Sequence, residues 1–177
     1  AECRQNSSGV LRELATTWHR EAQKTQNSET YALAMLLYRE YLDTFPKEND
    51  TYEMTYYYAE LLYKLKRWEP AAEVYTKVVK MKAGGKYLKD AAYAAVISWR
   101  SALNVSMETQ DTTRKSKRKK KKRRGKKAKK EVVVKAAKPL PIDEKKLKMI
   151  AAFDTYIKHV PKSDELVSII YRKARIY

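Results

Sequence analysis

Small and aromatic residues recur along this chain at spacings of three and four, which is the period of one face of an α-helix. The pattern occurs as Ala34, Tyr38, Tyr41 and Pro46, as Ala71, Tyr75 and Val78, and as Met149, Phe153, Tyr156 and Pro161. Twelve residues before the first two copies stand Ala22 and Ala59, small residues of the kind that let helices approach closely. Proline cannot continue a helix because it lacks the amide donor. The pattern therefore predicts pairs of antiparallel helices, with the second helix ending before the proline.

The helix pairs are predicted to repeat. The first pair is expected from about Ala15 to about Glu48, the second from about Tyr52 to about Gly85, and the third begins near Tyr87. A shift of 115 residues superposes Tyr41 and Pro46 on Tyr156 and Pro161, and a shift of 35 superposes Tyr58, Ala59 and Leu61 on Tyr93, Ala94 and Val96. One pair cannot bury its apolar face alone, so we expect the pairs to stack into a continuous core.

The repeat pattern divides the chain into three parts. Residues 1–105 hold the first two repeats and the first helix of the third, and residues 106–143 are an insertion. Residues 144–177 hold the second helix of the third repeat and the first helix of a truncated fourth, so we expect Tyr177 to be a fragment boundary. Only 4 glycines and 5 prolines occur in 177 residues, which also favours an all-α fold over a turn-rich β fold.

Tyrosine is frequent, with 14 copies, and Tyr56, Tyr57 and Tyr58 are consecutive, so they point in three directions on a helix. One interpretation is that most tyrosines pack in the core with their hydroxyls reaching the surface. The other is that first helices line a concave face that binds a peptide or helix of a protein partner. For that groove we predict Thr55, Tyr56, Tyr58, Glu60, Tyr63, Asp90, Tyr93 and Ile97.

The positive charge is concentrated in the insertion. Fourteen of the 17 residues from Arg114 to Lys130 are lysine or arginine, which leaves 25 basic residues against 21 acidic ones elsewhere. Such a run repels itself and is expected to be disordered. Its alternative function is to bind a polyanion, either nucleic acid or an anionic membrane, by phosphate neutralisation. The residues predicted for that role are Lys119, Lys120, Lys121, Lys122, Arg123 and Arg124.

Residues that support catalysis are few. His19 and His159 lie in separate helical patterns and are expected at a surface or boundary, and Cys3 has no second thiol for a disulfide or a zinc pair. The segment AGGK at residues 83–86 has too few glycines for a phosphate loop and is expected to end a helix. We therefore predict no catalytic site, no metal site and no cofactor. No apolar run reaches the ~18 residues that a membrane-spanning helix needs.

The paired-helix spacing resembles the tetratricopeptide repeat over most of residues 10–105 and 145–177. That resemblance implies a right-handed superhelical solenoid of helix-turn-helix repeats that acts as a non-enzymatic binding scaffold. Residues 38–79 and 85–99 also look like the repeat proteins in the envelopes of myxobacteria and related gliding bacteria. This second similarity implies a multiprotein envelope complex and a periplasmic location, with the cytoplasm as the alternative. The lysine-rich insertion is a departure from the repeat pattern.

Overall fold

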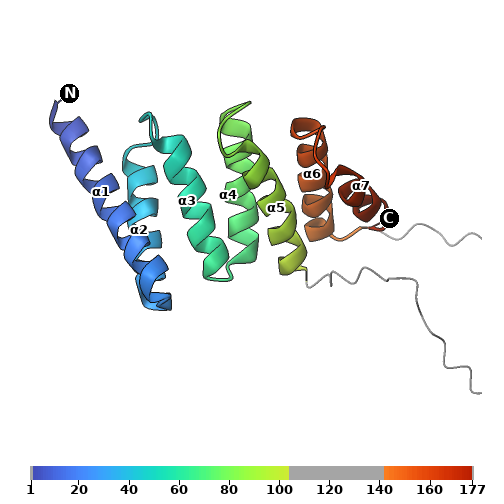
Figure 1. The fold of residues 1–177 in the computed structure, drawn as a ribbon, viewed down its shortest axis with the longest axis horizontal. Coiled ribbons are helices and arrows are strands. Elements are labelled where there is room, and N and C mark those ends of the chain that lie inside the picture. The colour runs from blue at the N-terminus through green and yellow to red at the C-terminus, as the bar shows by residue number, and fades with distance from the viewer. Residues whose placement is uncertain (1, 104–141, 177) are drawn as a thin grey trace, which may run out of the picture.

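A computed structural model describes residues 2–103 and 142–176, and within them the chain forms seven α-helices and no strand (Figure 1). The all-helical fold class is thus confirmed. The helices are α1 (Glu2–Thr25), α2 (Ser28–Thr44), α3 (Thr51–Lys64), α4 (Trp68–Met81), α5 (Leu88–Ala102), α6 (Glu144–His159) and α7 (Leu166–Ala174). The basic run predicted to bind polyanions lies outside the described residues. No helix in the described part is both long and apolar enough to cross a membrane.

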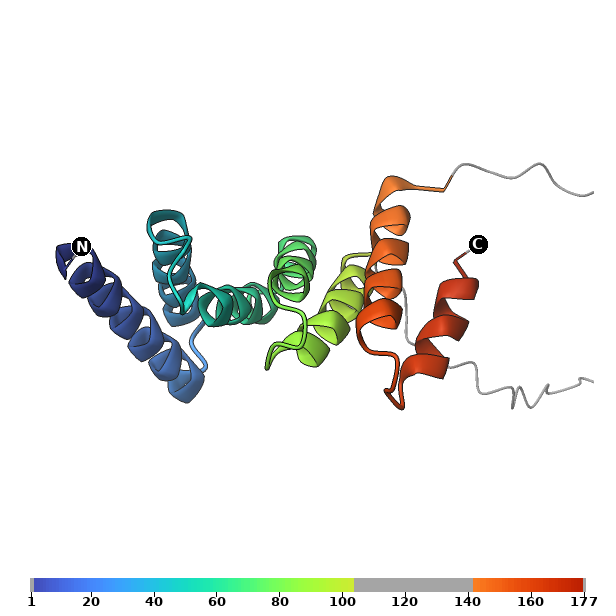
Figure 2. The same cartoon turned by 90° about the horizontal axis from the view of Figure 1, so that it is seen from above.

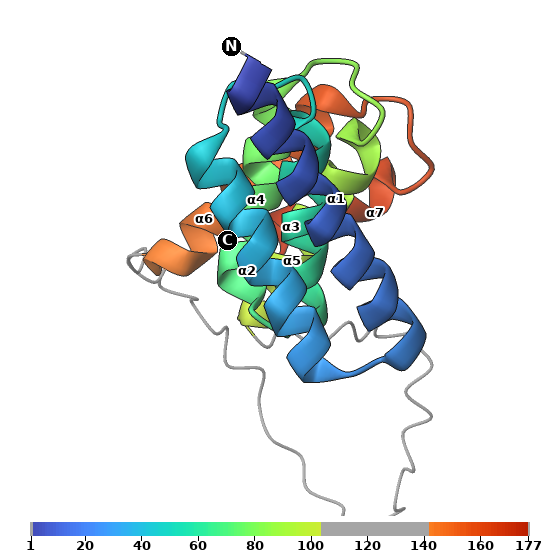
Figure 3. The ribbon, with the colours of Figure 1, turned by 90° about the vertical axis from the view of Figure 1, so that its left-hand side faces the viewer.

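The helices form a row with the chain ends at opposite sides (Figure 1), and consecutive helices from α1 to α5 run in opposite directions. Each helix packs on its neighbours in the sequence, and α4 also contacts α6. Seen from above and from one end, α2, α4 and α6 lie on one side of the row and α1, α3, α5 and α7 on the other (Figures 2 and 3). We call the second side the odd-helix face.

The core contains the residues that the sequence pattern singles out. The nine recurring residues of α2, α4 and α6 are all buried, at no more than 3% exposure: Ala34, Tyr38, Tyr41, Ala71, Tyr75, Val78, Met149, Phe153 and Tyr156. Ala22 and Ala59 are fully buried as well, and their small side chains leave room for close helix packing. The helices also end where predicted, because α2 and α6 stop two residues before Pro46 and Pro161.

Burial along α3 and α5 corrects the predicted repeat offset. Met54 and Thr55 are buried in α3, and Ala91 and Ala92 are buried in α5, 37 residues later. Further along the same helices, Leu61 and Leu62 are buried in α3, and Ser98 and Trp99 are buried in α5, again 37 residues later. The offset of 35 residues pairs the fully buried Ala59 with Ala94, which is only partly buried, so the repeat offset is 37 residues and not 35.

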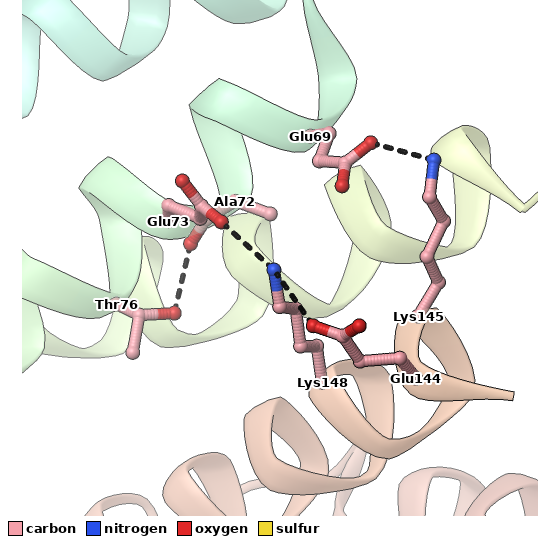
Figure 4. A network of polar contacts seen from close by, with 7 residues as sticks. All are labelled: Glu69, Ala72, Glu73, Thr76, Glu144, Lys145 and Lys148. Carbon is pink, nitrogen blue, oxygen red and sulfur yellow. Dashed lines mark hydrogen bonds and ion pairs between the residues drawn. The ribbon is translucent and has the colours of Figure 1, made fainter. Parts of the chain in front are cut away.

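Two ion pairs link α6 to α4 (Figure 4). Lys145 Nζ lies 2.9 Å from Glu69 Oε2, and Lys148 Nζ lies 3.4 Å from Glu73 Oε1. Lys148 also lies 3.8 Å from Glu144 on its own helix. These side chains are solvent exposed, so the pairs contribute little to stability. The helix α6 packs mainly on α5.

Candidate functional site

A hollow of about 880 Å³ opens on the odd-helix face between α1 and α3. Most of its lining comes from one side of α1, and α3 supplies the opposite wall. His19, Tyr38 and Tyr57 form its floor, and Tyr38 reaches it from α2 behind. Because α1 and α2 pack along their lengths while α1 and α3 do not, the space between the two odd helices stays open.

The floor is a cluster of three aromatic rings. The His19 ring meets Tyr38 and Tyr57 edge to face, with both centroid distances at 5.7 Å. Its Nδ1 lies 3.3 Å from the Tyr38 hydroxyl, and its Nε2 lies 3.3 Å from the Gln23 amide nitrogen. Burial lowers the pKa of His19, because the charged imidazolium loses its hydration, and burial raises the pKa of Tyr38. The floor is therefore uncharged at neutral pH.

The rim of the hollow carries charge of both signs. Arg12 Nη1 lies 2.7 Å from Asp50 Oδ2 and joins α1 to the residue just before α3. Glu13 and Arg20 also line the hollow, and both are exposed. The rim therefore offers an acceptor and a donor around a neutral aromatic floor, an arrangement suited to binding a polar side chain with an apolar body.

The next space along the same face, between α3 and α5, is filled by tyrosine rings. Tyr87 precedes α5 and stacks on Tyr56, with centroids 4.2 Å apart and planes at 8°. Its hydroxyl donates to Glu53 Oε1 and lies 3.1 Å from the Tyr57 hydroxyl. Its backbone amide donates to the Tyr52 hydroxyl at 3.1 Å. These contacts bridge α3 to the start of α5.

Two of the predicted groove residues on α3 do not lie on the odd-helix face. Thr55 is 1% exposed and its hydroxyl donates to the Thr51 carbonyl at 2.6 Å, so it has no surface for a partner. Its prediction as a contact residue is corrected, because a residue adjacent to Met54 on α3 turns into the core. Tyr58 is half buried and lies near the charged side chains of Arg39 and Asp43, which belong to α2 and not to the odd-helix face.

The other predicted residues belong to α3 and α5, and none of them lines the hollow. Tyr56 stacks on Tyr87, and Glu60 accepts a hydrogen bond from Tyr75 at 2.5 Å. Tyr63 packs against Trp68 and Tyr93 against Tyr156, with ring centroids 4.8 and 6.2 Å apart. Burial raises the pKa of Tyr56, and the charges of Glu60 and of the exposed Asp90 raise it further. Ile97 is half buried. The structure thus gathers Tyr56, Glu60, Tyr63, Asp90, Tyr93 and Ile97 around α3 and α5, not around the hollow.

Sequence reasoning missed the residues that line the hollow. His19, expected at a surface or boundary, is 8% exposed and lines the hollow, and Glu53 and Tyr57 are absent from the predicted groove. The 37-residue period contains the missing signal, because it places His19 at the same position as Tyr56. Within residues 2–103 and 142–176, no three side chains of His, Cys, Asp or Glu gather where they could hold a metal ion.

Comparison with known proteins adds no assignment. A scan against protein-family models finds none that matches this chain, and a search of curated proteins finds no relative that matches. The geometry of the odd-helix face must therefore carry the functional argument.

Proposed function

We propose that this protein is a non-enzymatic scaffold that binds a peptide or helix of a protein partner on its odd-helix face. In this proposal the helix pairs are tetratricopeptide-like repeats that build a right-handed superhelical solenoid. Support comes from the recurring buried positions, from burial that repeats every 37 residues, and from packing between neighbours in a row. Stacked helix pairs with these properties commonly present extended concave binding surfaces.

The hollow between α1 and α3 is the observation that carries the proposal. Its volume of about 880 Å³ falls in the ~300–1,000 Å³ range of protein ligand sites. It is open on one side, and its floor combines ring surface with the polar atoms of His19 and Tyr38. A segment of a partner chain fits such a site, because its side chain enters the hollow while its backbone follows the helices on either side.

The proposal includes the setting implied by the resemblance, a multiprotein complex of the cell envelope, with the periplasm as the location. The second candidate is polyanion binding through Arg114 to Lys130, favoured by 14 basic residues among 17. The two candidates separate experimentally, since phosphate neutralisation weakens steeply with salt, whereas binding on the uncharged floor of the hollow depends much less on salt.

Site-specific photocrosslinking in the full chain tests the scaffold proposal. A photoreactive amino acid at Glu13, in the rim, should crosslink a protein partner in the native cells, while the same group at Glu40, exposed on α2, should not. A second chain lacking residues 114–130 should give the same crosslink. Equal crosslinking from both positions would overturn the odd-helix face as the binding surface. Loss of the crosslink on nuclease treatment or on deletion of the run would favour polyanion binding.

A further inference from the structure

The residue just before α3 differs from the residue just before α5 in a way that accounts for the hollow. Asp50 precedes α3, and Tyr87 precedes α5, one 37-residue period later. The Tyr87 ring fills the space between α3 and α5 by stacking on Tyr56. Asp50 has no ring, and its carboxylate turns to Arg12 on the rim instead. The space between α1 and α3 therefore lacks the ring that its neighbour contains.

The hollow is lined by the counterparts of the residues that surround Tyr87, although their residue types differ. Glu53, Tyr56 and Tyr57 surround the Tyr87 ring. The residues 37 positions earlier are Thr16, His19 and Arg20, and all three line the hollow. His19 offers a ring at the position of Tyr56, and both of its aromatic contacts in the described residues are edge to face. Neither of these contacts stacks a ring on the imidazole.

The side chains that a phenol oxygen would meet differ between the two sites. At the filled site, Tyr87 donates its hydroxyl hydrogen to the Glu53 carboxylate. At the hollow, Arg20 provides a guanidinium donor and the Thr16 hydroxyl already donates to the Glu13 carbonyl at 3.0 Å. A phenol oxygen placed there accepts from Arg20, and its hydrogen is available to the lone pairs on the Thr16 hydroxyl.

We propose that the hollow binds a tyrosine side chain of the partner protein, which stacks on His19 as Tyr87 stacks on Tyr56 and accepts a hydrogen bond from Arg20. This inference rests on the proposed function, because it names the side chain that a peptide partner inserts. The chain itself supplies the precedent for the ring, since Tyr87 fills the corresponding space one period later. A phenol is favoured over a phenyl ring because its oxygen can accept a hydrogen bond from Arg20, which a phenyl ring cannot do.

The experiment uses peptides selected from a random phage-displayed library on the immobilised full chain, followed by fluorescence titration of the synthetic peptides. The selected peptides should share a tyrosine, and replacing it with alanine should weaken binding at least about tenfold. The variant Asp50→Tyr installs the ring of the next repeat inside the hollow and should abolish binding. Asp50→Ala removes the same ion pair without adding a ring and should retain binding. Asp43→Tyr adds a ring on exposed α2 and serves as the matched control.

A second readout does not depend on the folding of Asp50→Tyr. The full chain should bind a tyrosine peptide more tightly than its phenylalanine counterpart, and Arg20→Ala, at an exposed position, should remove that preference. Peptides that bind without an aromatic residue and ignore Asp50→Tyr would overturn the inference while leaving the scaffold proposal standing. A selection that yields no peptide at all would overturn the scaffold proposal, and the inference with it.

Discussion

Two tyrosines at corresponding positions, Tyr38 in α2 and Tyr75 in α4, give a sharp test of how the core is stabilised. Both are 1% exposed, so changing either to phenylalanine removes one oxygen atom and leaves the packing intact. Their hydroxyl partners differ. The Tyr75 hydroxyl donates to the Glu60 carboxylate at 2.5 Å, while the Tyr38 hydroxyl lies 3.3 Å from Nδ1 of the neutral His19.

The expected costs follow from the charge of the partner. A hydrogen bond to a charged group contributes about 1.5–3 kcal/mol, and one between neutral groups about 0.5–1.5 kcal/mol. We therefore expect Tyr75→Phe to lower the free energy of unfolding by about 2 kcal/mol and Tyr38→Phe by about 1 kcal/mol. Burial and the Glu60 hydrogen bond both raise the pKa of Tyr75, as expected for a phenol held as a donor.

Urea unfolding of the full chain, followed by circular dichroism and by tryptophan fluorescence, measures both costs. At a typical slope of about 2 kcal/mol per molar urea, Tyr75→Phe should shift the midpoint by about 1 M and Tyr38→Phe by about half as much. A double-mutant cycle with Glu60→Gln isolates the pair, because the coupling energy between the two changes excludes the hydrogen bond that Glu60 also makes with Tyr56. An equal cost of Tyr38→Phe and Tyr75→Phe would refute the stabilising role assigned to the charged partner.

Three further predictions concern pH, salt and packing. The unfolded chain binds a proton on His19 more tightly than the folded chain, so stability should fall as pH drops through about 6.5, by up to about 1.4 kcal/mol per pH unit. His19→Gln should reduce that slope in urea titrations between about pH 7 and about pH 5.5, and an unchanged slope would contradict the burial argument. Lys148→Ala breaks the exposed pair with Glu73 and should cost less than about 1 kcal/mol, a loss that should shrink in high salt; a larger, salt-independent loss would point to packing instead. Gly85→Ala places a methyl group against the Tyr52 hydroxyl and should lower the free energy of unfolding by about 1 kcal/mol or more, whereas no change would mean that the Tyr52 ring moves freely aside.

The sequence predicts the buried side of the even-numbered helices well, because small and aromatic residues at spacings of three and four fall on one side of a helix and on both sides of a strand. Ala34, Tyr38 and Tyr41 are typical, and all are buried in α2. The helix ends at Pro46 and Pro161 are equally predictable, since proline cannot continue the helical hydrogen bonds.

The binding face is harder to predict, because one residue of helix is a rotation of about 100° and a small register error moves a side chain from surface to core. Thr55 shows that error, since it lies beside Met54 in the core. The hollow itself depends on a residue that is small where its counterpart is large. The difference can be recognised only with the 37-residue period, which makes Asp50 and Tyr87 equivalent positions of successive repeats.

The row of helices has unequal stiffness along its length. Between α3 and α5, the Tyr87 ring contacts Tyr52, Tyr56 and Tyr57, so a change in the angle between these helices disturbs several contacts at once. Between α1 and α3, the Arg12 pair with Asp50 is an exposed and adaptable link. The angle between α1 and α3 can therefore change at lower cost than the angle between α3 and α5. A side chain that enters the hollow would contact both α1 and α3 and so restrict the angle between them.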